Sequence, residues 1–361
     1  MGYAEAITFR ELYFAARECA NGVRWKESVQ DFLRSHLKRT LSLARDLRSD
    51  RYKISPYVRF VVTEPKKREI VSTRFRDRVF QRAMCNNGLY RDMTRSFIYD
   101  SGACQNGRGT DFSRNRLKMH LNRFRRKHGT DGWVLKLDVK NFFASIPHRI
   151  AKAAVAKRVK DPGFVRRIFE VIDSFADSPP PGEEPRGIAL GSQISQLIAL
   201  AVLDDFDHAI KERFRIRHYV RYMDDMVLIH EDREKLMECW RFAEEHFSSI
   251  GLTINPKSTL LRLQQGFSFL NRRHFFTASG RLIVKVAHKS ISRERRRLRS
   301  IHTLWMRGKL SDRDVIEHFT AWKATATKAD SHGLIRAMTK YAKSLFNKEN
   351  QNARIQDKKP E

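Results

Sequence analysis

Cysteine is scarce in this sequence: the 361 residues include only four, Cys19, Cys85, Cys104 and Cys239. They stand far apart, and no two form the Cys-x-x-Cys pair that is typical of zinc sites and redox centres. A small protein stapled by disulfides would need more cysteines at closer spacing. We therefore expect reduced thiols in a cytoplasmic protein, and neither a disulfide framework nor a zinc site.

Long apolar runs are also missing. No segment approaches the roughly 18 consecutive apolar residues that a membrane-spanning helix requires. The N-terminal residues lack the basic stretch followed by an apolar stretch that marks a secretion signal. The sequence therefore predicts no transmembrane segment.

Acidic residues are few relative to basic ones. Lys and Arg number 71 against 41 Asp and Glu, which gives a formal net charge of +30 at pH 7. Such an excess favours nucleic acid as the partner, because Lys and Arg displace the counterions of phosphates. An anionic membrane surface is the alternative. With 41% hydrophobic residues, a chain of this length can bury a large core arranged as two or three subdomains.

Helical periodicity dominates the first fifty residues. Two apolar stripes recur at helical spacing: Phe9, Leu12, Tyr13 and Ala16, and then Leu33, Leu37, Leu41 and Ala44. Apolar residues at this spacing line the buried side of a helix. We therefore expect helices in residues 1–50, with these stripes facing a core.

A strand is predicted at residues 133–139, because apolar residues alternate there with polar ones. Leu135, Leu137 and Val139 fall on one face, and Lys136 and Asp138 fall on the other. Alternation of this kind is typical of a sheet with one buried face. Asp138 is therefore expected to project from a sheet whose opposite face is buried.

Two further carboxylates are expected at the tip of a hairpin. Asp224 and Asp225 lie between apolar runs at 216–220 and 226–229, a strand–turn–strand pattern. Adjacent carboxylates repel each other, and a divalent cation would offset the repulsion. The alternative interpretation is an Asp pair that only ends a strand.

The chemistry that best fits three such carboxylates in a basic chain is nucleotidyl transfer. Phosphoryl transfer depends on charge neutralisation and in-line positioning more than on covalent chemistry. Two Mg²⁺ ions about 4 Å apart can activate a hydroxyl and hold a departing pyrophosphate, and Mg²⁺ prefers hard oxygen ligands. Asp138 and Asp224 would supply the bridging carboxylates.

The acidic segments together resemble those of reverse transcriptases. Residues 135–143 with 145–148 are similar to the first catalytic strand of bacterial reverse transcriptases related to group II introns, and residues 222–225 are similar to the family's second catalytic motif. The resemblance spans residues 57–275. It implies an RNA-directed DNA polymerase in which Asp138, Asp224, Asp225 and the carbonyl of Val139 bind two Mg²⁺ ions, with Mn²⁺ as a possible substitute.

The same resemblance implies roles around this metal site. Phe143 would lie under the sugar of the incoming nucleotide, where a 2′-hydroxyl would clash, so that dNTPs are favoured over NTPs. Phe142 beside it is expected in the core, which is also the alternative for Phe143. Lys66 and Arg68 match residues that hold the triphosphate, and Lys257 matches a lysine that protonates the departing pyrophosphate.

The segment at 189–196 separates this chain from most reverse transcriptases. Leu190 stands before Gly191 where the family usually has Gln, and Gln196 follows Ser195 where it usually has Pro. This combination resembles the enzymes of diversity-generating retroelements, which miscopy adenines of a template RNA and use the cDNA to rewrite a target gene. Leu190 offers no side-chain hydrogen bond to a nascent base pair. The alternative is that Leu190 only packs and that fidelity is set elsewhere.

The residues after Lys285 are predicted to be helical and strongly basic. Apolar stripes recur at Ile291, Leu298, Ile301 and Trp305, at Val315, Phe319 and Trp322, and at Leu334, Met338, Tyr341 and Leu345, and Ser311 with Asp314 forms a predicted capping box. Glu294 is the one acidic residue in this basic stretch of the first helix. Four arginines of the same helix are predicted to contact nucleic-acid phosphates: Arg293, Arg296, Arg297 and Arg299.

These expectations define an α+β right-hand polymerase: fingers and a palm, in which an antiparallel sheet is backed by helices, and a helical thumb. We expect an N-terminal helical extension at 1–50, fingers at 51–130 with part of 150–190 interleaved, a palm at 131–280, a thumb at 281–349 and a polar tail at 350–361. The implied partners are template RNA, cDNA or an RNA–DNA hybrid, dNTPs and a small basic oligomeric accessory protein, with no membrane. The implied location is the cytoplasm of a bacterial or phage-infected cell.

Three rival interpretations are weaker. A retron reverse transcriptase, or another enzyme of the group II-like class acting in phage defence, would share the catalytic residues. The blocks typical of retrons, Asn-Ala-x-x-His and Val-Thr-Gly, are not found, and a group II intron maturase would need further domains after the thumb. A catalytically dead RNA-binding scaffold is disfavoured because Asp138, Asp224 and Asp225 are all present.

Overall fold

The computed structural model describes residues 2–63, 68–175, 182–189 and 191–347. The chain forms two compact units. Unit 1 comprises Met1–His120 and Val134–Leu260, and unit 2 comprises Leu121–Trp133 and Leu261–Glu361. Both acidic segments of the predicted active site therefore belong to unit 1.

Four helices open unit 1: α1 (Tyr3–Ala6), α2 (Phe9–Ala20), α3 (Glu27–Arg34) and α4 (His36–Arg48). The side chain of Thr8 caps α2 by accepting a hydrogen bond from the backbone N–H of Glu11 (3.4 Å). Leu12 and Ala16 of the first predicted stripe are fully buried on α2. The N-terminal region is helical, as its periodicity predicts.

The prediction that the second apolar stripe of this region faces the core is wrong. Leu37 and Leu41 of α4 are 64% and 57% exposed, whereas Leu43 and Leu47 are buried. α4 carries two overlapping stripes, and packing against α2 selects the one that includes the polar Thr40. Tertiary contact therefore outweighed the more regular apolar spacing.

A hairpin and a bent helical segment follow. β1 (Val58–Val62) pairs antiparallel with β2 (Arg68–Ser72) as a two-stranded sheet. Next, α5 (Phe75–Met84) packs against α2. The π-helical turn η1 (Cys85–Leu89), in which Gly88 has a φ of 124°, separates α5 from α6 (Tyr90–Thr94). A left-handed φ of this kind favours glycine, and the resulting bend sets α6 off from α5.

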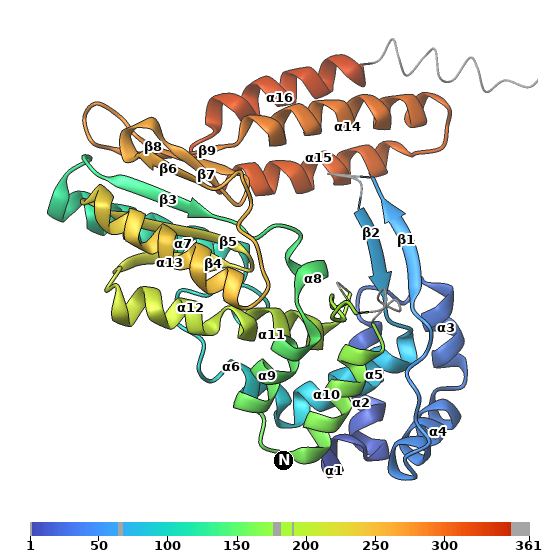
Figure 1. The fold of residues 1–361 in the computed structure, drawn as a ribbon. Coiled ribbons are helices and arrows are strands. Elements are labelled where there is room, and N and C mark those ends of the chain that lie inside the picture. The colour runs from blue at the N-terminus through green and yellow to red at the C-terminus, as the bar shows by residue number, and fades with distance from the viewer. Residues whose placement is uncertain (1, 64–67, 176–181, 190, 348–361) are drawn as a thin grey trace, which may run out of the picture. The chain divides into compact units, whose positions relative to one another are not determined.

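Four strands form the central sheet in the order β4-β5-β3-β6 (Figure 1). They are β3 (Trp133–Leu137), β4 (His218–Tyr222), β5 (Asp225–His230) and β6 (Thr259–Arg262). The middle residues of β4 and β5 are buried, and α13 (Arg233–Ser249) packs against β5. Asp138 directly follows β3, and Asp224 lies in the turn between β4 and β5, so both carboxylates stand where strands end.

The remaining elements of unit 1 are helical. They are α8 (Phe142–Ser145), α9 (His148–Arg158), α10 (Pro162–Asp173), α11 (Gln193–Val202), α12 (Asp204–His208) and the π-helical turn η2 (Ala209–Arg213). The long helix α7 (Thr110–His128) runs from unit 1 into unit 2. α11 is apolar around most of its circumference, and it is buried against α5, α6, α9 and α12.

Unit 2 contains a small sheet and three helices. After the 3₁₀ turn η3 (Leu263–Gln265), β7 (Phe267–Phe269), β8 (Arg272–Phe276) and β9 (Leu282–Val286) form an antiparallel sheet in sequence order. The helices are α14 (His288–Met306), α15 (Asp312–Ala326) and α16 (His332–Leu345). The predicted capping box of Ser311 and Asp314 is confirmed at the start of α15. In the described part of the chain, no helix is long and apolar enough to cross a membrane.

Candidate active site

Asp138 is held by the segment that precedes β6. Its carboxylate Oδ2 accepts a hydrogen bond from Asn255 Nδ2 (2.6 Å), and its carbonyl accepts one from the Asn255 backbone N–H (2.8 Å). Its own backbone N–H donates to the Oγ of Ser258 (3.2 Å). The orientation of the Asn255 amide follows from a further bond, because its Oδ1 accepts from the N–H of Lys257 (3.1 Å). The carboxylate of Asp138 is thus fixed before any ligand binds.

The hairpin of β4 and β5 has a turn of two residues. Tyr222 pairs with Asp225, which leaves Met223 and Asp224 as the turn. Met223 has a φ of 54°, in the left-handed region that a side chain seldom adopts. The turn therefore stores some backbone strain, and it projects Asp224 beyond the ends of both strands.

Asp138 and Asp224 come together at the strand ends. Burial, and then the neighbouring carboxylates of Asp138 and Asp225, raise the pKa of Asp224 from 3.8 to about 6. Two partly buried carboxylates side by side are unfavourable when both are charged, and a bound divalent cation removes that cost. These donors are hard oxygens, so the residues present fit Mg²⁺ or Mn²⁺.

Asp225 and Val139 flank this pair. The carboxylate of Asp225 lies 3.8 Å from the Nζ of Lys136, so it is held toward β3. Val139 is buried and forms an antiparallel bridge with Ile254. Across the described ranges, no group of three His, Cys, Asp or Glu side chains is placed so that it could bind a metal ion. The ligand roles of Asp225 and of the Val139 carbonyl remain predictions.

A buried ion pair supports the turn from within, and the sequence did not indicate it. Arg221 and Asp207 are both fully buried, and Arg221 donates to Asp207 through Nε (2.8 Å) and Nη2 (2.5 Å). Tyr219 donates its hydroxyl to the same carboxylate (2.6 Å). The Nη1 of Arg221 then donates to the carbonyl of Met223 (3.1 Å). Arg221 therefore anchors the strained residue that precedes Asp224.

The backbone of Arg221 is also tied to a neighbouring segment. Its N–H donates to the carbonyl of Asp100 (3.1 Å), and its carbonyl accepts from the N–H of Gly102 (3.0 Å). Although burial opposes it, hydrogen bonds from His120 and Arg116 hold the pKa of Asp100 well below its usual range. Asp100 is therefore a stable anion that fixes this segment beside β4.

The residues predicted to bind the nucleotide are only partly within the described ranges. Lys66 and Leu190 lie outside them, and of Arg68 only the backbone is described, paired with Val62 at the start of β2. Gly191 approaches β2 closely, because a Cβ there would lie 3.3 Å from the Ser72 Cα. Gln196 lies on α11, half-buried.

The two phenylalanines after Asp138 differ as the sequence predicts. Phe142 is 3% exposed and belongs to the core, whereas Phe143 is only half-buried. Their rings meet edge to face with centroids 5.7 Å apart. The carbonyl of Phe143 accepts from the N–H of Ile188 (3.0 Å), which ties this residue to the segment that leads to Gly191.

Lys257 stands on the loop that holds Asp138. It is exposed, two residues after Asn255, and its side chain extends from a backbone anchored to the Asn255 amide. This position in unit 1 is compatible with a proton donor near the metal site. The role itself remains a prediction.

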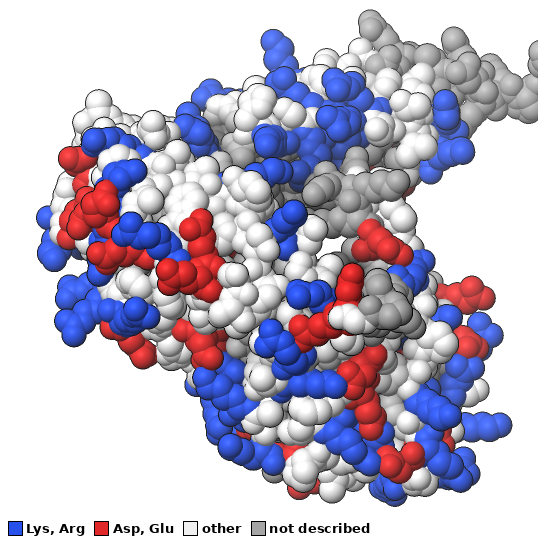
Figure 2. Space-filling model, viewed as in Figure 1, with Lys and Arg blue, Asp and Glu red and all other residues white. Residues whose placement is uncertain are grey.

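In unit 2, the basic residues of α14 form an exposed face. Arg296, Arg297 and Arg299 are exposed and Arg293 is half-buried. Glu294, the only acidic residue of α14, is 7% exposed and accepts from His318 of α15 (2.9 Å). Lys and Arg side chains also gather over the face of unit 2 that Figure 2 shows around α14 and α15. The outward side of α14 is therefore of one charge sign.

Comparisons with known proteins agree with this arrangement. Residues 63–272 match the family model described as reverse transcriptase (RNA-dependent DNA polymerase). Protein YkfC of Escherichia coli (strain K12) is 26% identical over 281 residues, which are 67% of this chain and 72% of that protein. The model match covers more than half of the chain and includes Asp138, Asp224 and Lys257.

A solved structure shows the same fold. Telomerase from Candida albicans, in complex with a fragment of telomeric RNA, aligns with a TM-score of 0.50 at 12% identity over 67% of this chain. The alignment spans 46% of that telomerase chain, so the chain described here corresponds to about half its length. The antiparallel sheet backed by helices is that of a right-hand polymerase. Because the reverse transcriptase model matches more than half of its residues, this chain belongs to the reverse transcriptase family of RNA-directed DNA polymerases.

Proposed function

We propose that this protein copies the template RNA of a diversity-generating retroelement into error-prone cDNA that carries substitutions at adenines. The observation that carries the proposal is the pair Leu190 and Gln196, in the positions where most reverse transcriptases have Gln and Pro. Gly191 between them packs against β2, so this segment adjoins the hairpin that bears Arg68. An apolar side chain there provides no hydrogen bond to reward correct pairing.

Metal binding is part of this proposal. Asp138 and Asp224, with Asp225 and the carbonyl of Val139, would hold two Mg²⁺ ions. When bound, the ions activate the primer hydroxyl and neutralise the departing pyrophosphate. Asn255 and Arg221 keep the two carboxylates in position, Phe143 excludes a 2′-hydroxyl, and Lys66 and Arg68 hold the triphosphate. Lys257 supplies a proton to the pyrophosphate.

The partners follow from the same proposal. They are template RNA with its cDNA, dNTPs and the small basic oligomeric accessory protein of the retroelement, in the cytoplasm of a bacterial or phage-infected cell. The exposed arginines of α14 contact phosphates of the template–primer duplex. The rival proposal of a retron or other group II-like enzyme shares these parts. A pair of repeats near the gene that differ mainly at adenines would separate the two.

Replacing Leu190 by Gln is expected to lower misincorporation opposite template adenines while synthesis continues. One restored hydrogen bond is worth roughly 0.5–1.5 kcal/mol, which corresponds to about two- to tenfold fewer errors. The measurement is sequencing of cDNA made from one RNA by both enzymes. Leu190→Met is the control, because it keeps an apolar side chain and should leave the error spectrum unchanged. Equal spectra for Leu190→Gln and the wild type would remove Leu190 from the explanation.

Replacing Phe143 by Ala is expected to admit ribonucleotides. The half-buried ring is the proposed barrier to a 2′-hydroxyl, and removing it should reduce the preference for dNTP over NTP by about 10- to 100-fold. Single-nucleotide incorporation with dNTP and NTP in parallel measures this ratio. Phe142→Leu is the matched control, since Phe142 is buried in the core. A ratio that changes equally in both variants would show that Phe143 acts through packing alone.

A further inference from the structure

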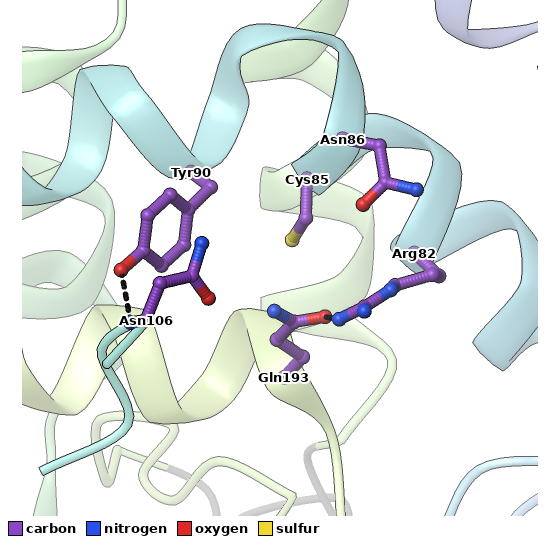
Figure 3. A pocket seen from close by; sticks show the side chains of 6 residues that line it. All are labelled: Arg82, Cys85, Asn86, Tyr90, Asn106 and Gln193. Atoms are coloured by element: carbon purple, nitrogen blue, oxygen red, sulfur yellow. Dashed lines mark hydrogen bonds between the residues drawn. The ribbon is translucent and has the colours of Figure 1, made fainter. Parts of the chain in front are cut away.

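A polar hollow of about 250 Å³ lies in unit 1 beside α11 (Figure 3). It is lined by six side chains from α5, η1, α6, the loop after Ser101 and α11: Arg82, Cys85, Asn86, Tyr90, Asn106 and Gln193. A second hollow of about 270 Å³ shares Arg82 and Gln193 with it. None of the six lining residues has a role in the active site described above.

The hollow is polar, but its charge is already balanced. Arg82 donates through Nε to Oε2 of Glu18 (2.8 Å), and the same oxygen accepts from Asn86 Nδ2 (3.0 Å). A phosphate site needs a cation that is free to pair with the anion. The hollow is therefore suited to a neutral polar group.

The side-chain amides of Gln193 and Asn106 are placed so that they can form hydrogen bonds with the polar edge of a ligand in the hollow. Oε1 of Gln193 accepts from Nη1 of Arg82 (3.1 Å), so the Nε2 of Gln193 is left to donate to a ligand. The backbone N–H of Asn106 donates to the hydroxyl of Tyr90 (2.6 Å). In the described part of the chain, no hydrogen bond engages the side-chain amide of Asn106. Figure 3 shows that amide directed into the hollow, next to the ring of Tyr90.

These groups match a nucleobase. Asn and Gln amides pair with base edges because they present a donor and an acceptor side by side, and an aromatic ring offers a face on which a base can stack. The volume is smaller than the roughly 300–1,000 Å³ of sites that enclose a whole small molecule. It suits one flat ring system whose sugar and phosphate remain outside.

Two of the lining segments lead directly to the active site. The loop that carries Asn106 begins at Ser101, which forms a β-bridge with Arg221. α11 begins one residue after Ser192, which donates its hydroxyl to Gln81 of α5 (2.6 Å) and follows Gly191. A template strand that waits to be copied is single-stranded, and its bases are free to leave the stack.

We propose that the hollow receives one unpaired base of the template RNA, from the stretch that has not yet been copied. This inference rests on the RNA-templated synthesis proposed above. The base stacks on Tyr90 and accepts a hydrogen bond from Gln193, and the Asn106 amide meets its polar edge. The site gives the incoming template a fixed register before it reaches Asp138 and Asp224.

The test scans a single abasic site along a short 5′ template overhang. Fluorescence anisotropy measures the binding of the full-length protein to each primer–template, without dNTPs so that no synthesis occurs. One overhang position should lower the affinity of the wild type by about tenfold when it is abasic. Asn106→Ala and Tyr90→Ala should bind the intact overhang about tenfold more weakly and should be insensitive to the abasic site at that position. Asn115→Ala, an exposed Asn on α7, is the control and should behave like the wild type.

Two results would overturn the proposal. The first is a scan in which an abasic site, at every overhang position, lowers the affinity of the wild type no more than it lowers the affinity of Asn106→Ala. The other is a loss of affinity in Asn106→Ala that is equally large for a blunt duplex without an overhang. The proposed adenine mutagenesis can fail separately, because it concerns the error spectrum of the cDNA and leaves overhang binding unchanged.

Discussion

Replacing Asp224 by Asn is expected to abolish primer extension while leaving the protein folded. The substitution keeps the shape of the side chain and removes the negative charge that, under the proposed function, holds a metal ion. Metal-assisted charge stabilisation is worth several kcal/mol, so the rate should fall by about a thousandfold or more. Primer extension on an RNA template with Mg²⁺ measures the loss, and binding of the same template–primer should persist.

A second readout of Asp224→Asn separates metal binding from folding. Because burial beside Asp138 raises the pKa of Asp224 from 3.8, its value in an unfolded chain, to about 6, the charged form destabilises the metal-free protein at pH 7. This penalty shrinks as the pH falls from about 6 toward 3.8, because the carboxyl is then protonated in the folded protein. The variant lacks this penalty, so without metal its melting temperature at pH 7 should be higher than that of the wild type. Added Mg²⁺ should raise the melting temperature of the wild type and have less effect on the variant. Asp31→Asn, on the exposed surface of α3, should behave like the wild type in both measurements. Full primer extension by Asp224→Asn would refute the catalytic assignment.

Breaking the pair of Arg221 and Asp207 is expected to reduce both stability and catalysis. Asp207→Leu leaves a fully buried guanidinium without its partner, which typically costs about 3–5 kcal/mol. The free energy of unfolding from denaturant titration measures this loss. Because Arg221 also anchors the carbonyl of Met223, the turn that carries Asp224 should lose its fixed position.

Apolar replacement of the whole cluster separates these two effects. When Asp207→Leu, Arg221→Met and Tyr219→Phe are combined, no buried charge is left without its partner, and most of the stability should return. Catalysis should not return, because nothing then holds Met223, and the Mg²⁺ concentration for half-maximal extension should rise. The matched control is Arg158→Met, which breaks a similarly buried pair with Asp204 (2.6 Å). It should lower stability without changing the Mg²⁺ requirement. Full activity and an unchanged Mg²⁺ requirement in the triple variant would exclude a positioning role for Arg221.

The predictable parts of the site are those that leave a local pattern. Alternation located Asp138 at the end of a strand, and two apolar runs located Asp224 in a turn, since both signals lie within a few residues. The supports of these carboxylates were not predicted. Asn255 reaches Asp138 from a distant segment, and a single Arg in an apolar strand gives no sign that its partner is Asp207 on another helix.

The errors of prediction have a similar origin. The stripe of Leu37 and Leu41 on α4 was the more regular one, yet periodicity cannot state which of two overlapping faces a neighbouring helix will cover. The sequence likewise sets Glu294 among the arginines of α14, whereas the structure buries its side chain and pairs it with His318. Composition counts charges, but only packing decides on which side of a helix they act.

The burial of Glu294, away from the exposed arginines of α14, bears on how the polymerase moves along its substrate. A face of arginines uninterrupted by an acidic residue presents nearly the same attraction to every phosphate of a nucleic-acid backbone. Each nucleotide step then exchanges one phosphate for an equivalent one, so the interaction energy changes little between registers. Under the proposed function, α14 holds the duplex tightly without trapping it at any position, and translocation meets a smooth energy profile.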